Sequence, residues 1–443
     1  MTKLLFTTLP SNDLGLLTRS LPVARELANR GHTICFCNPG KAPRKMIADA
    51  GFQNYLPDEP LYYFIAGDLS PQGLFRFIRS GRVKRNLASF IRCSRAFFQS
   101  STAEVWNIDH FMTFFGMRDA HFIRANVDAL IGIIRDWEVD AIVDFWNPFA
   151  CIAARVTDKP LITIIQADMH PQSRGFIWWK QPPSDLPTPV PVVNQVMASY
   201  GLHPIRSIGE LVIGDLTLVV GIPEMDPLPQ RAGVTYIGPI LWQSLNAKLP
   251  DWMSDLSADT PLIWVYPGNL RYVLGRSTSF DSAVVLRACI DALEDEAVQV
   301  ILTTGHHSLP RRFLPLPSNF RHEPFVPGLA MAERSDLLIH HGGYGSCQTG
   351  LYTGTPAVII PTFSERESNA RRIAAQGAGD FVLPISDASG RKKHVRAQEL
   401  RVKVNHVLYD SSFEENAKRV SERLKSYGGA NEAGRLIEGF VQA

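Results

Sequence analysis

The chain has 443 residues, of which 45% are hydrophobic and 20% are charged, and its formal net charge is +2. This length suits two domains better than one, and the composition is that of an ordinary globular protein. The small net charge gives no general electrostatic case for binding nucleic acid. No apolar run approaches the roughly 18 residues of a membrane-spanning helix, and the first residues do not form a signal peptide. We therefore expect a cytoplasmic protein.

The cysteines give no sign of a metal site or of a disulfide framework. They are scattered, and no two have the spacing of a metal-binding pair. We expect buried free thiols in a reducing compartment. The six are Cys35, Cys37, Cys93, Cys151, Cys289 and Cys347.

The first half alternates between short apolar runs and helical periodicity. A helix is expected at residues 16–30, where Gly31 ends it. This order of strand, loop, helix and strand opens a doubly wound parallel sheet, whose ligands bind at the carboxyl ends of the strands. The runs that predict strands are 3–9, 32–37, 141–145, 161–166 and 216–220, with the last of them closing the first half.

Residues 69–103 hold seven arginines and lysines and no acidic residue, with aromatic and aliphatic side chains between them. Such a basic amphipathic stretch can lie on a membrane surface or bind an anionic acceptor. It can also be a helix pair packed on the domain with its cations in solvent. The aromatic residues between 106 and 122 could line an apolar pocket or only pack together.

The second half repeats the alternation of strands and helices. Strands are expected at 261–266, 298–304 and 335–340, and a helix at 282–293. Residues 221–260 are rich in proline and have little periodicity, which indicates a linker. We place the first domain at 1–225, the linker at 226–260, and the second domain at 261–425. Two such halves predict a cleft between them.

The stretch from 340 to 372 is the most informative part of the sequence. It reads as a strand end, a turn with Gly342, Gly343 and Gly345, and a helix that begins at Tyr344. Glycine lets the backbone approach a ligand closely, and a helix N-terminus attracts anions. His341 and Ser346 could add hydrogen-bond donors, so this stretch predicts a phosphate or diphosphate site.

Four more loops that suit a nucleotide follow strands of the second half. They hold Gly268 with Asn269, residues 304–306, residues 324–328, and residues 361–370. In the last of these, Glu365 and Arg366 are expected in a loop before a helix, where they could bind sugar hydroxyls. Together the loops predict a nucleotide-sugar site.

The motifs of this half resemble those of the family-1, UDP-glycosyltransferase-like enzymes of the GT-B fold, of the bacterial natural-product type. The resemblance is carried by HGGYGS at 341–346, by GTP at 354–356 with Pro361, and by ERESNA at 365–370. The first half agrees more loosely, through ARELANRGHTICF at 24–36. The resemblance implies two Rossmann-like doubly wound α/β domains. It also implies a C-terminal helix, 426–443, that packs back on the first domain.

The resemblance also assigns roles to residues. It places His341, Gly343, Gly345 and Ser346 on the donor diphosphate, with Gly268 and Asn269 approaching the phosphates from the first strand-loop. It implies an inverting transfer from a UDP- or dTDP-linked sugar to an apolar or aromatic acceptor, without a cofactor or an essential metal. Flanking the base and reading the sugar would be Phe325, Val326, Glu365 and Arg366.

The sequence departs from the family pattern at three places. The ribose-binding glutamate of the family falls on Thr349, which is a poorer acceptor for a diol. The usual Asp-Gln pair is Glu365-Arg366, so the sugar need not be glucose. The histidine that usually acts as base falls on Leu16, which cannot accept a proton.

Three residues are candidates to replace that base. Asp13 lies in the same loop, three residues away, and could instead be a turn residue or helix cap. Asp144 matches the position where the family has a base-supporting aspartate. His170 follows the strand 161–166 and could also be an ordinary loop histidine. Asp109 and His110 are further candidates.

We expect a glycosyltransferase with a nucleotide-sugar donor and a hydrophobic small-molecule or lipid acceptor. Two alternatives stay open: a nucleotide-sugar epimerase on the same fold, and a non-catalytic partner protein that has lost the base. Peripheral membrane contact through 69–103 and a homodimer are further expectations.

Overall fold

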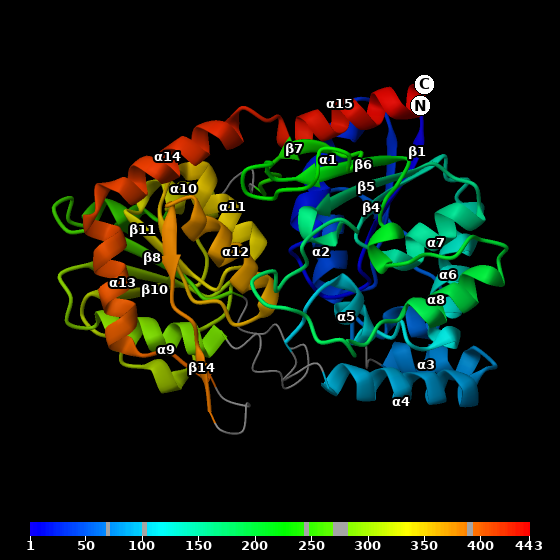
Figure 1. Cartoon of the computed structure of the whole chain (residues 1–443), viewed down its shortest axis with the longest axis horizontal. Helices are drawn as coiled ribbons and strands as arrows, with labels where there is room; N and C mark the ends of the chain where they lie inside the picture. The colour runs from blue at the N-terminus through cyan, green and yellow to red at the C-terminus, as the bar shows by residue number, and fades with distance from the viewer. Residues whose placement is uncertain (68–70, 100–103, 243–247, 269–281, 388–392) are drawn as a thin grey trace. The chain divides into compact units, whose positions relative to one another are not determined.

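The computed structural model describes residues 1–67, 71–99, 104–242, 248–268, 282–387 and 393–443, and only the backbone at 71–74, 98 and 99. The chain folds into two compact α/β units, each coloured along the chain in Figure 1. The first unit comprises residues 1–100, 106–242 and 427–443. The second comprises residues 101–105 and 243–426.

The first unit is built on a seven-stranded parallel sheet of order β3-β2-β1-β4-β5-β6-β7. Its central strands are mostly apolar and almost wholly buried, as expected where both faces of a parallel sheet are covered; Leu4, Leu5 and Phe6 of β1 are fully buried. The strands are β1 (Lys3–Thr8), β2 (Thr33–Cys37), β3 (Gln53–Asn54), β4 (Ala141–Phe145), β5 (Leu161–Gln166), β6 (Leu216–Val220) and β7 (Thr235–Gly238).

Helices cover this sheet and extend from it. The longer ones are α1 (Leu17–Asn29), α2 (Lys41–Asp49), α3 (Pro71–Arg79), α4 (Val83–Gln99), α5 (Ile108–Thr113), α6 (Ala120–Asp136), α7 (Pro148–Val156), α8 (Val190–Ala198) and α15 (Gly429–Gln442). Short 3₁₀ turns are η1 (Pro60–Tyr63), η3 (Ala167–Met169) and η4 (Ile208–Glu210).

The second unit has a six-stranded parallel sheet of order β10-β9-β8-β11-β12-β13, which repeats the strand order of the first six strands of the first sheet. A two-stranded antiparallel ribbon, β14 with β15, follows it. The strands are β8 (Leu262–Tyr266), β9 (Gln299–Thr303), β10 (Phe320–Glu323), β11 (Leu337–His340), β12 (Ala357–Ile359), β13 (Gly379–Phe381), β14 (Ile385–Ser386) and β15 (Lys393–His394).

The core of the second unit lies between its sheet and two helices. Val285, Cys289 and Leu293 of α9 and Leu400 and Val404 of α13 are buried against the apolar strands. Each fully buried aliphatic side chain contributes roughly 1.5–3 kcal/mol. The helices of this unit are η5 (Asp251–Asp255), α9 (Ser282–Leu293), η7 (Arg311–Phe313), α10 (Gly328–Arg334), α11 (Tyr344–Thr353), α12 (Ser364–Ala375), α13 (Ala397–Tyr409) and α14 (Ser411–Lys425).

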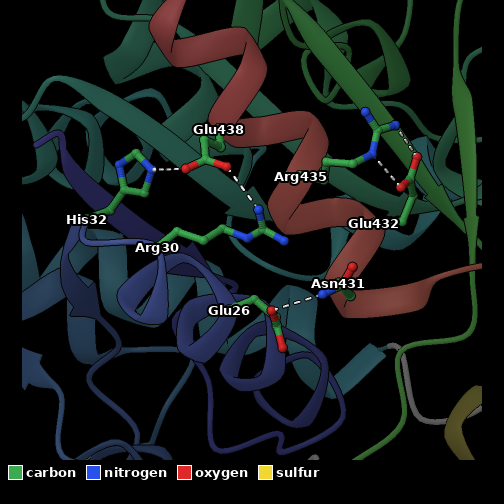
Figure 2. A network of polar contacts seen from close by, with 7 residues as sticks. All are labelled: Glu26, Arg30, His32, Asn431, Glu432, Arg435 and Glu438. Carbon is green, nitrogen blue, oxygen red and sulfur yellow. Dashed lines mark hydrogen bonds and ion pairs between the residues drawn. The ribbon is translucent and has the colours of Figure 1, made fainter.

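The last helix, α15, packs on α1 of the first unit, and Figure 2 shows the polar contacts between them. Glu438 receives a hydrogen bond of 2.9 Å from Arg30 Nη1, and its other oxygen lies 3.9 Å from His32 Nε2. Asn431 Nδ2 donates to Glu26 Oε2 at 3.3 Å. The end of the chain is thus part of the N-terminal unit.

The expectation of two doubly wound α/β domains is confirmed, and three details differ. A seventh strand, β7, follows β6, so 216–220 does not close the first sheet. It lies in the proline-rich stretch expected to be a linker, where its four residues are too few to show a period. Glu365 and Arg366 are in the first turn of α12, not in a loop before it. The short strands β3, β10, β13, β14 and β15 were not expected either.

All six cysteines are buried and free, as expected. Burial raises the pKa of the Cys35 and Cys37 thiols to about 12. Across the described residues, none of the helices combines the length and the apolarity that crossing a membrane requires.

Candidate functional site

The strand order places one pair of loops at the switch point of the second sheet. From the central β8 the chain moves to one side, to β9 and β10, and later returns on the other side through β11. Tyr266 and His340, which end β8 and β11, are register partners. In doubly wound folds ligands bind where the loops diverge at this point. The two loops that meet here hold Gly268 and the 341–345 turn.

The ring of His341 fills the space between two glycines. A Cβ on Gly268 would lie 3.1 Å from Cε1 of the ring, and a Cβ on Gly343 would lie 2.4 Å from Nε2. Gly268 also has a φ of +90°, which disfavours any other residue. A side chain at either glycine would crowd the imidazole, so both positions require glycine if the ring is to keep this place. The sequence alone did not reveal this reason for the two glycines.

The turn after His341 leads directly into α11. Gly343 is the N-cap of the helix and has no side chain to occupy the amide groups of the first turn. A Cβ on Gly345 would meet nothing within 4 Å, so the backbone there is open to an incoming group. Ser346 is half-buried in the same turn. This helix start has the geometry and the positive partial charge of an anion site.

Both histidines of this turn are neutral at physiological pH. Burial lowers the pKa of His340 to about 4. The pKa of His341 lies well below its usual value, first because of burial and then because of the Arg366 charge. His341 Nδ1 and His340 Nε2 are buried and make no hydrogen bond within the described residues. Unpaired buried nitrogens are uncommon, and those next to an anion site suit ligand contact.

The first turn of α12 is tied to the same turn. Asn369 Nδ2 donates to the carbonyl oxygen of Gly342 at 2.9 Å and to Glu365 Oε1 at 2.8 Å. Arg366 Nη1 donates to Thr362 Oγ1 at 2.8 Å. One amide thus fixes the Glu365 carboxylate beside the glycine turn. Arg366 also lies beside this turn, because its Cβ would be 3.0 Å from a Cβ on Gly342, so Glu365 and Arg366 both lie near His341.

The predicted base-binding residues lie on the loop after β10. Phe325 is 41% exposed and stacks on His306 with ring centroids 4.1 Å apart, whereas Val326 is buried. His306 has a φ of +68°, a conformation that only a few non-glycine residues adopt. An exposed planar pair of this kind suits stacking with a nucleobase.

Two further donor-site predictions have different outcomes. Asn269 lies outside the described residues. Thr349 lies on α11, and its hydroxyl donates to the Gly345 carbonyl oxygen at 2.9 Å. Its proton is used within the helix, and its neutral oxygen is a weaker acceptor for a ribose diol than a carboxylate would be.

In the first unit, Asp13 follows β1 in a tight turn. Gly15 N–H donates to Asp13 Oδ1 at 3.0 Å, and Asp13 N–H donates to Ser11 Oγ at 3.2 Å. The carboxyl group is half-exposed and does not cap α1, whose N-cap is Leu16. Leu16 is 7% exposed and therefore part of the core.

Asp144 is fully buried in the centre of the first sheet. It accepts a hydrogen bond of 2.6 Å from Thr7 Oγ1 and bonds of 2.9 and 3.0 Å from the Asn147 amide. Burial raises its pKa to about 7, and these bonds oppose that shift. These hydrogen bonds join β1, β4 and the start of α7, so the carboxylate helps to hold the three elements together.

The ring of His170 is also committed to the fold. Gln172 N–H donates to Nδ1 at 3.1 Å, and Nε2 lies 3.2 Å from the Ala232 carbonyl oxygen. Nε2 therefore carries the proton, and burial lowers the pKa of the ring. Asp109 accepts from Ile208 N–H at 2.8 Å, and burial raises its pKa.

The aromatic residues between 106 and 122 mostly form core. Phe114, Phe115 and Phe122 are buried. The half-buried Phe111 stacks against Phe115 at 4.5 Å and against Trp146 at 5.3 Å. Packing thus explains most of this aromatic cluster.

Sequence reasoning missed the positions that hold the site together. Asn369 was quoted only as part of a motif, although its place four residues after Glu365 on a helix indicated contact. Lys393 of β15 donates to the Thr362 carbonyl oxygen at 2.8 Å, which places a second cation near Arg366. No local signal in the sequence pointed to Lys393. Among the described residues, no three metal-ligating side chains gather.

Comparisons with known proteins bear on the family and the fold. A family model described as "Erythromycin biosynthesis protein CIII-like, C-terminal domain" matches residues 287–438. The chain is 26% identical over 229 residues to "Uncharacterized UDP-glucosyltransferase YojK" of Bacillus subtilis, covering 51% of this chain and 52% of the relative. It is 28% identical over 329 residues to "PGL/p-HBAD biosynthesis glycosyltransferase" of Mycobacterium tuberculosis, covering 68% and 70%. The chain spans about half the length of the first curated relatives it matches.

A solved structure shares the fold over the whole chain. "CalG4, the Calicheamicin Glycosyltransferase" superposes with a TM-score of 0.70 at 20% identity, covering 100% of this chain and 98% of that one. The predicted GT-B fold and the resemblance to natural-product glycosyltransferases are confirmed.

Proposed function

We propose that this chain, which has the GT-B fold, is itself a glycosyltransferase that moves a sugar from a nucleoside diphosphate sugar to a hydroxyl group, with inversion. The observation that carries the proposal is the seat of His341 between Gly268 and Gly343, at the start of α11. Three parts of the second unit meet there, at the switch point of its doubly wound sheet: the loop after β8, the glycine turn after β11 and the start of α11. Each of them suits contact with a diphosphate.

On the donor side, the helix start and Arg366 supply positive charge, and His341 supplies a neutral ring. Because its pKa is low, one ring nitrogen carries a proton to donate and the other stays an acceptor. As the sugar–oxygen bond breaks, negative charge grows on the departing diphosphate, where amide groups stabilise it without reorganising. We assign Phe325 and Val326 to contact with the nucleobase. The donor nucleotide we propose is UDP or dTDP.

On the sugar side, Glu365 accepts hydrogen bonds from hydroxyl groups. Asn369 donates to one oxygen of the Glu365 carboxylate and so orients it. The other oxygen can accept charge-assisted hydrogen bonds from sugar hydroxyls, which favours a sugar whose hydroxyls match its position. Arg366 and Lys393 add positive charge that a neutral hexose does not require. Because of this charge, donor sugars with an anionic substituent, or with a strong hydrogen-bond acceptor, are the first to test.

We assign the base to Asp13. Asp13 Oδ1 is held by Gly15, which leaves Oδ2 of the half-exposed group to take the proton of the acceptor hydroxyl. The acceptor oxygen then bonds to the anomeric carbon as the bond to the diphosphate oxygen breaks, and the electron pair leaves with the diphosphate. Asp144 and His170 already use their polar atoms within the fold. The acceptor we propose is an apolar natural product or lipid.

Leu16 favours a second candidate, a non-catalytic partner that keeps the donor site but has no base. Two measurements separate the readings. A thermal-shift panel of UDP, dTDP and their sugars should stabilise the chain, because a ligand that binds the folded state raises its melting temperature. Mass spectrometry of donor and acceptor mixtures should then show a glycosylated product. Binding without transfer would support the partner protein, and no binding would contradict both.

A further inference from the structure

Helices α3 and α4 carry an apolar surface that the fold leaves in solvent. Twelve large hydrophobic side chains among the described residues are exposed, and five of them are on or next to these two helices. Phe75 and Ile78 of α3 are 62% and 63% exposed. Val83, Leu87 and Ile91 of α4 are 40%, 50% and 42% exposed and lie four residues apart, so they form one stripe along the helix. Figure 1 shows the two helices side by side in the first unit.

The opposite face of α4 is held by polar contacts. Asn86 and Ser89 are fully buried. Ser89 Oγ donates to Asp119 Oδ1 at 2.9 Å, and Asn86 Oδ1 lies 2.7 Å from His121 Nε2. Arg92 Nε donates to Asp119 Oδ2 at 2.6 Å. Because these bonds fix the helix on α6, α4 cannot turn to bury its apolar stripe without leaving buried polar groups unpaired.

Exposed cations accompany the apolar stripe in the same stretch of chain. The sequence from 71 to 99 has seven arginines and lysines and no acidic residue, although the net charge of the whole chain is only +2. Arg92 pairs with Asp119, and Arg76 lies over the ring of Tyr63 at 4.0 Å. The other five are exposed and have no ion-pair partner within the described ranges: Arg79, Arg82, Lys84, Arg85 and Arg95.

We propose that the α3–α4 face, made of these five apolar side chains and five cations, docks on the surface of an anionic lipid bilayer. Aromatic and aliphatic side chains would enter the boundary between headgroups and acyl chains, and the long cations would reach the lipid phosphates. The surface potential of anionic lipid attracts such clusters. The charge pattern favours lipid over a protein partner, because this stretch holds five exposed cations and no acidic residue, and a bilayer presents phosphates along its whole surface. This inference does not depend on the proposed transfer reaction.

Vesicle flotation with the full-length chain tests the proposal. The chain should bind vesicles of 70% phosphatidylcholine and 30% phosphatidylglycerol (about the anionic content at which basic clusters bind), and bind pure phosphatidylcholine at least about tenfold more weakly. Each cation contributes about fivefold to binding, so the triple variant should bind about 100-fold more weakly. The triple variant is Arg79→Gln, Arg82→Gln and Arg85→Gln.

Matched variants control for charge and apolarity elsewhere. Three exposed cations far apart in the sequence, changed by Arg231→Gln, Arg334→Gln and Arg419→Gln, should leave vesicle binding unchanged. For the apolar side chains, Phe75→Ser with Ile78→Ser, Leu87→Ser and Ile91→Ser should abolish it. Val402→Ser with Tyr409→Ser, both on α13 and exposed, should not.

Three results would overturn the proposal. The first is a wild-type chain that ignores anionic vesicles at low salt, and the second is an equal loss in the control variants. The third is sedimentation velocity without lipid in which the serine variants convert a dimer to a monomer while vesicle binding persists. That result would make the face an interface between copies. Since every changed side chain is exposed, melting curves should stay close to wild type, and a variant that unfolds is replaced by the charge variant.

Discussion

The imidazole of His341 lies against Gly268, so closely that a Cβ on the glycine would come within 3.1 to 3.3 Å of three ring atoms. The two residues come from loops that are 73 positions apart in the sequence, after β8 and after β11. The glycine is therefore part of the wall that orients the ring, in addition to any contact with phosphate.

Gly268→Ala should displace His341 and lower kcat/KM for the donor by about 100-fold, the scale expected when a reacting group is moved by about 1 Å. It should also cost roughly 1–2 kcal/mol of stability, since φ is +90°. Gly233→Ala is the matched control: it has a φ of +68° and nothing within 4 Å of the new Cβ. Equal kinetic losses in both variants would show that backbone strain, and not the ring contact, is responsible.

Asn369→Ala should raise the KM for the donor about tenfold, because it removes the bond that orients Glu365 and the one to Gly342. The measurement is steady-state kinetics of Asn369→Ala, Glu365→Gln and the double variant. If Asn369 acts through Glu365, the two losses should fall short of additivity by about 0.5–3 kcal/mol. Additive losses would mean that the amide acts only on the glycine turn.

Asp13→Asn should lower kcat by at least about 100-fold while leaving the affinity for the donor unchanged. Asparagine keeps an oxygen for the Gly15 amide, so the turn survives, but it cannot take up a proton. Asp144→Asn is the comparison, because that side chain is buried in the sheet and should change stability far more than kcat. Full turnover by Asp13→Asn would rule out Asp13 as the base.

The buried His340 should make the second unit sensitive to acid. Its pKa is about 4 in the folded chain and about 6.5 when unfolded. Between these values the unfolded chain binds a proton that the folded chain does not, so stability is complete above pH 6.5 and falls as the pH drops toward 4. At pH 5 the loss from this group is about 2 kcal/mol.

His340→Asn tests this directly, because the amide oxygen can accept from Gly342 N–H as Nδ1 does but does not titrate. Urea unfolding at pH 7 and pH 5 should show a smaller acid penalty in the variant. His203→Asn, at an exposed position, serves as the control. An unchanged penalty in His340→Asn would assign the acid sensitivity to other groups.

Glu438→Gln should lower the stability of the first unit by about 1 kcal/mol. The Glu438 carboxylate, on α15, accepts a hydrogen bond from Arg30 at the end of α1 and lies near His32, so it links two distant parts of the chain. Glu432→Gln is the control in the same helix: its partner is Arg435, three residues away, so the contact joins nothing distant. Its effect should stay within about 0.5 kcal/mol. Denaturant melts of both variants compare the two contacts, both of which are drawn in Figure 2.

Features of the fold were predicted correctly where the sequence pattern that indicates them lies within a few neighbouring residues. The buried strands and the start of α11 at Tyr344 were predicted well, because a continuous apolar run and a glycine turn are visible within ten residues. Strand β7 was missed, because four residues with nearby prolines carry no period.

Site residues were harder to predict, because their roles depend on distant partners. His170 is a candidate base from its place in the sequence, but its Nε2 contacts the carbonyl oxygen of Ala232, 62 residues away. Asp144 is explained by Thr7 on the neighbouring strand, and Lys393 by Thr362. No pattern within one segment reports such contacts. The glycines near His341 were predicted to let the backbone approach a ligand closely, which stays a prediction; in the structure, Gly268 and Gly343 make room for the His341 ring.

The return of α15 to the first unit also sets an order of events during synthesis. The chain leaves that unit after Trp242 and rejoins it at Tyr427, with 184 residues between them. A ribosome adding about 5 to 20 residues per second needs about 10 to 40 s for that stretch. Throughout this interval the side of α1 that α15 will cover is exposed on a nascent chain, so the N-terminal unit begins folding first but is completed last.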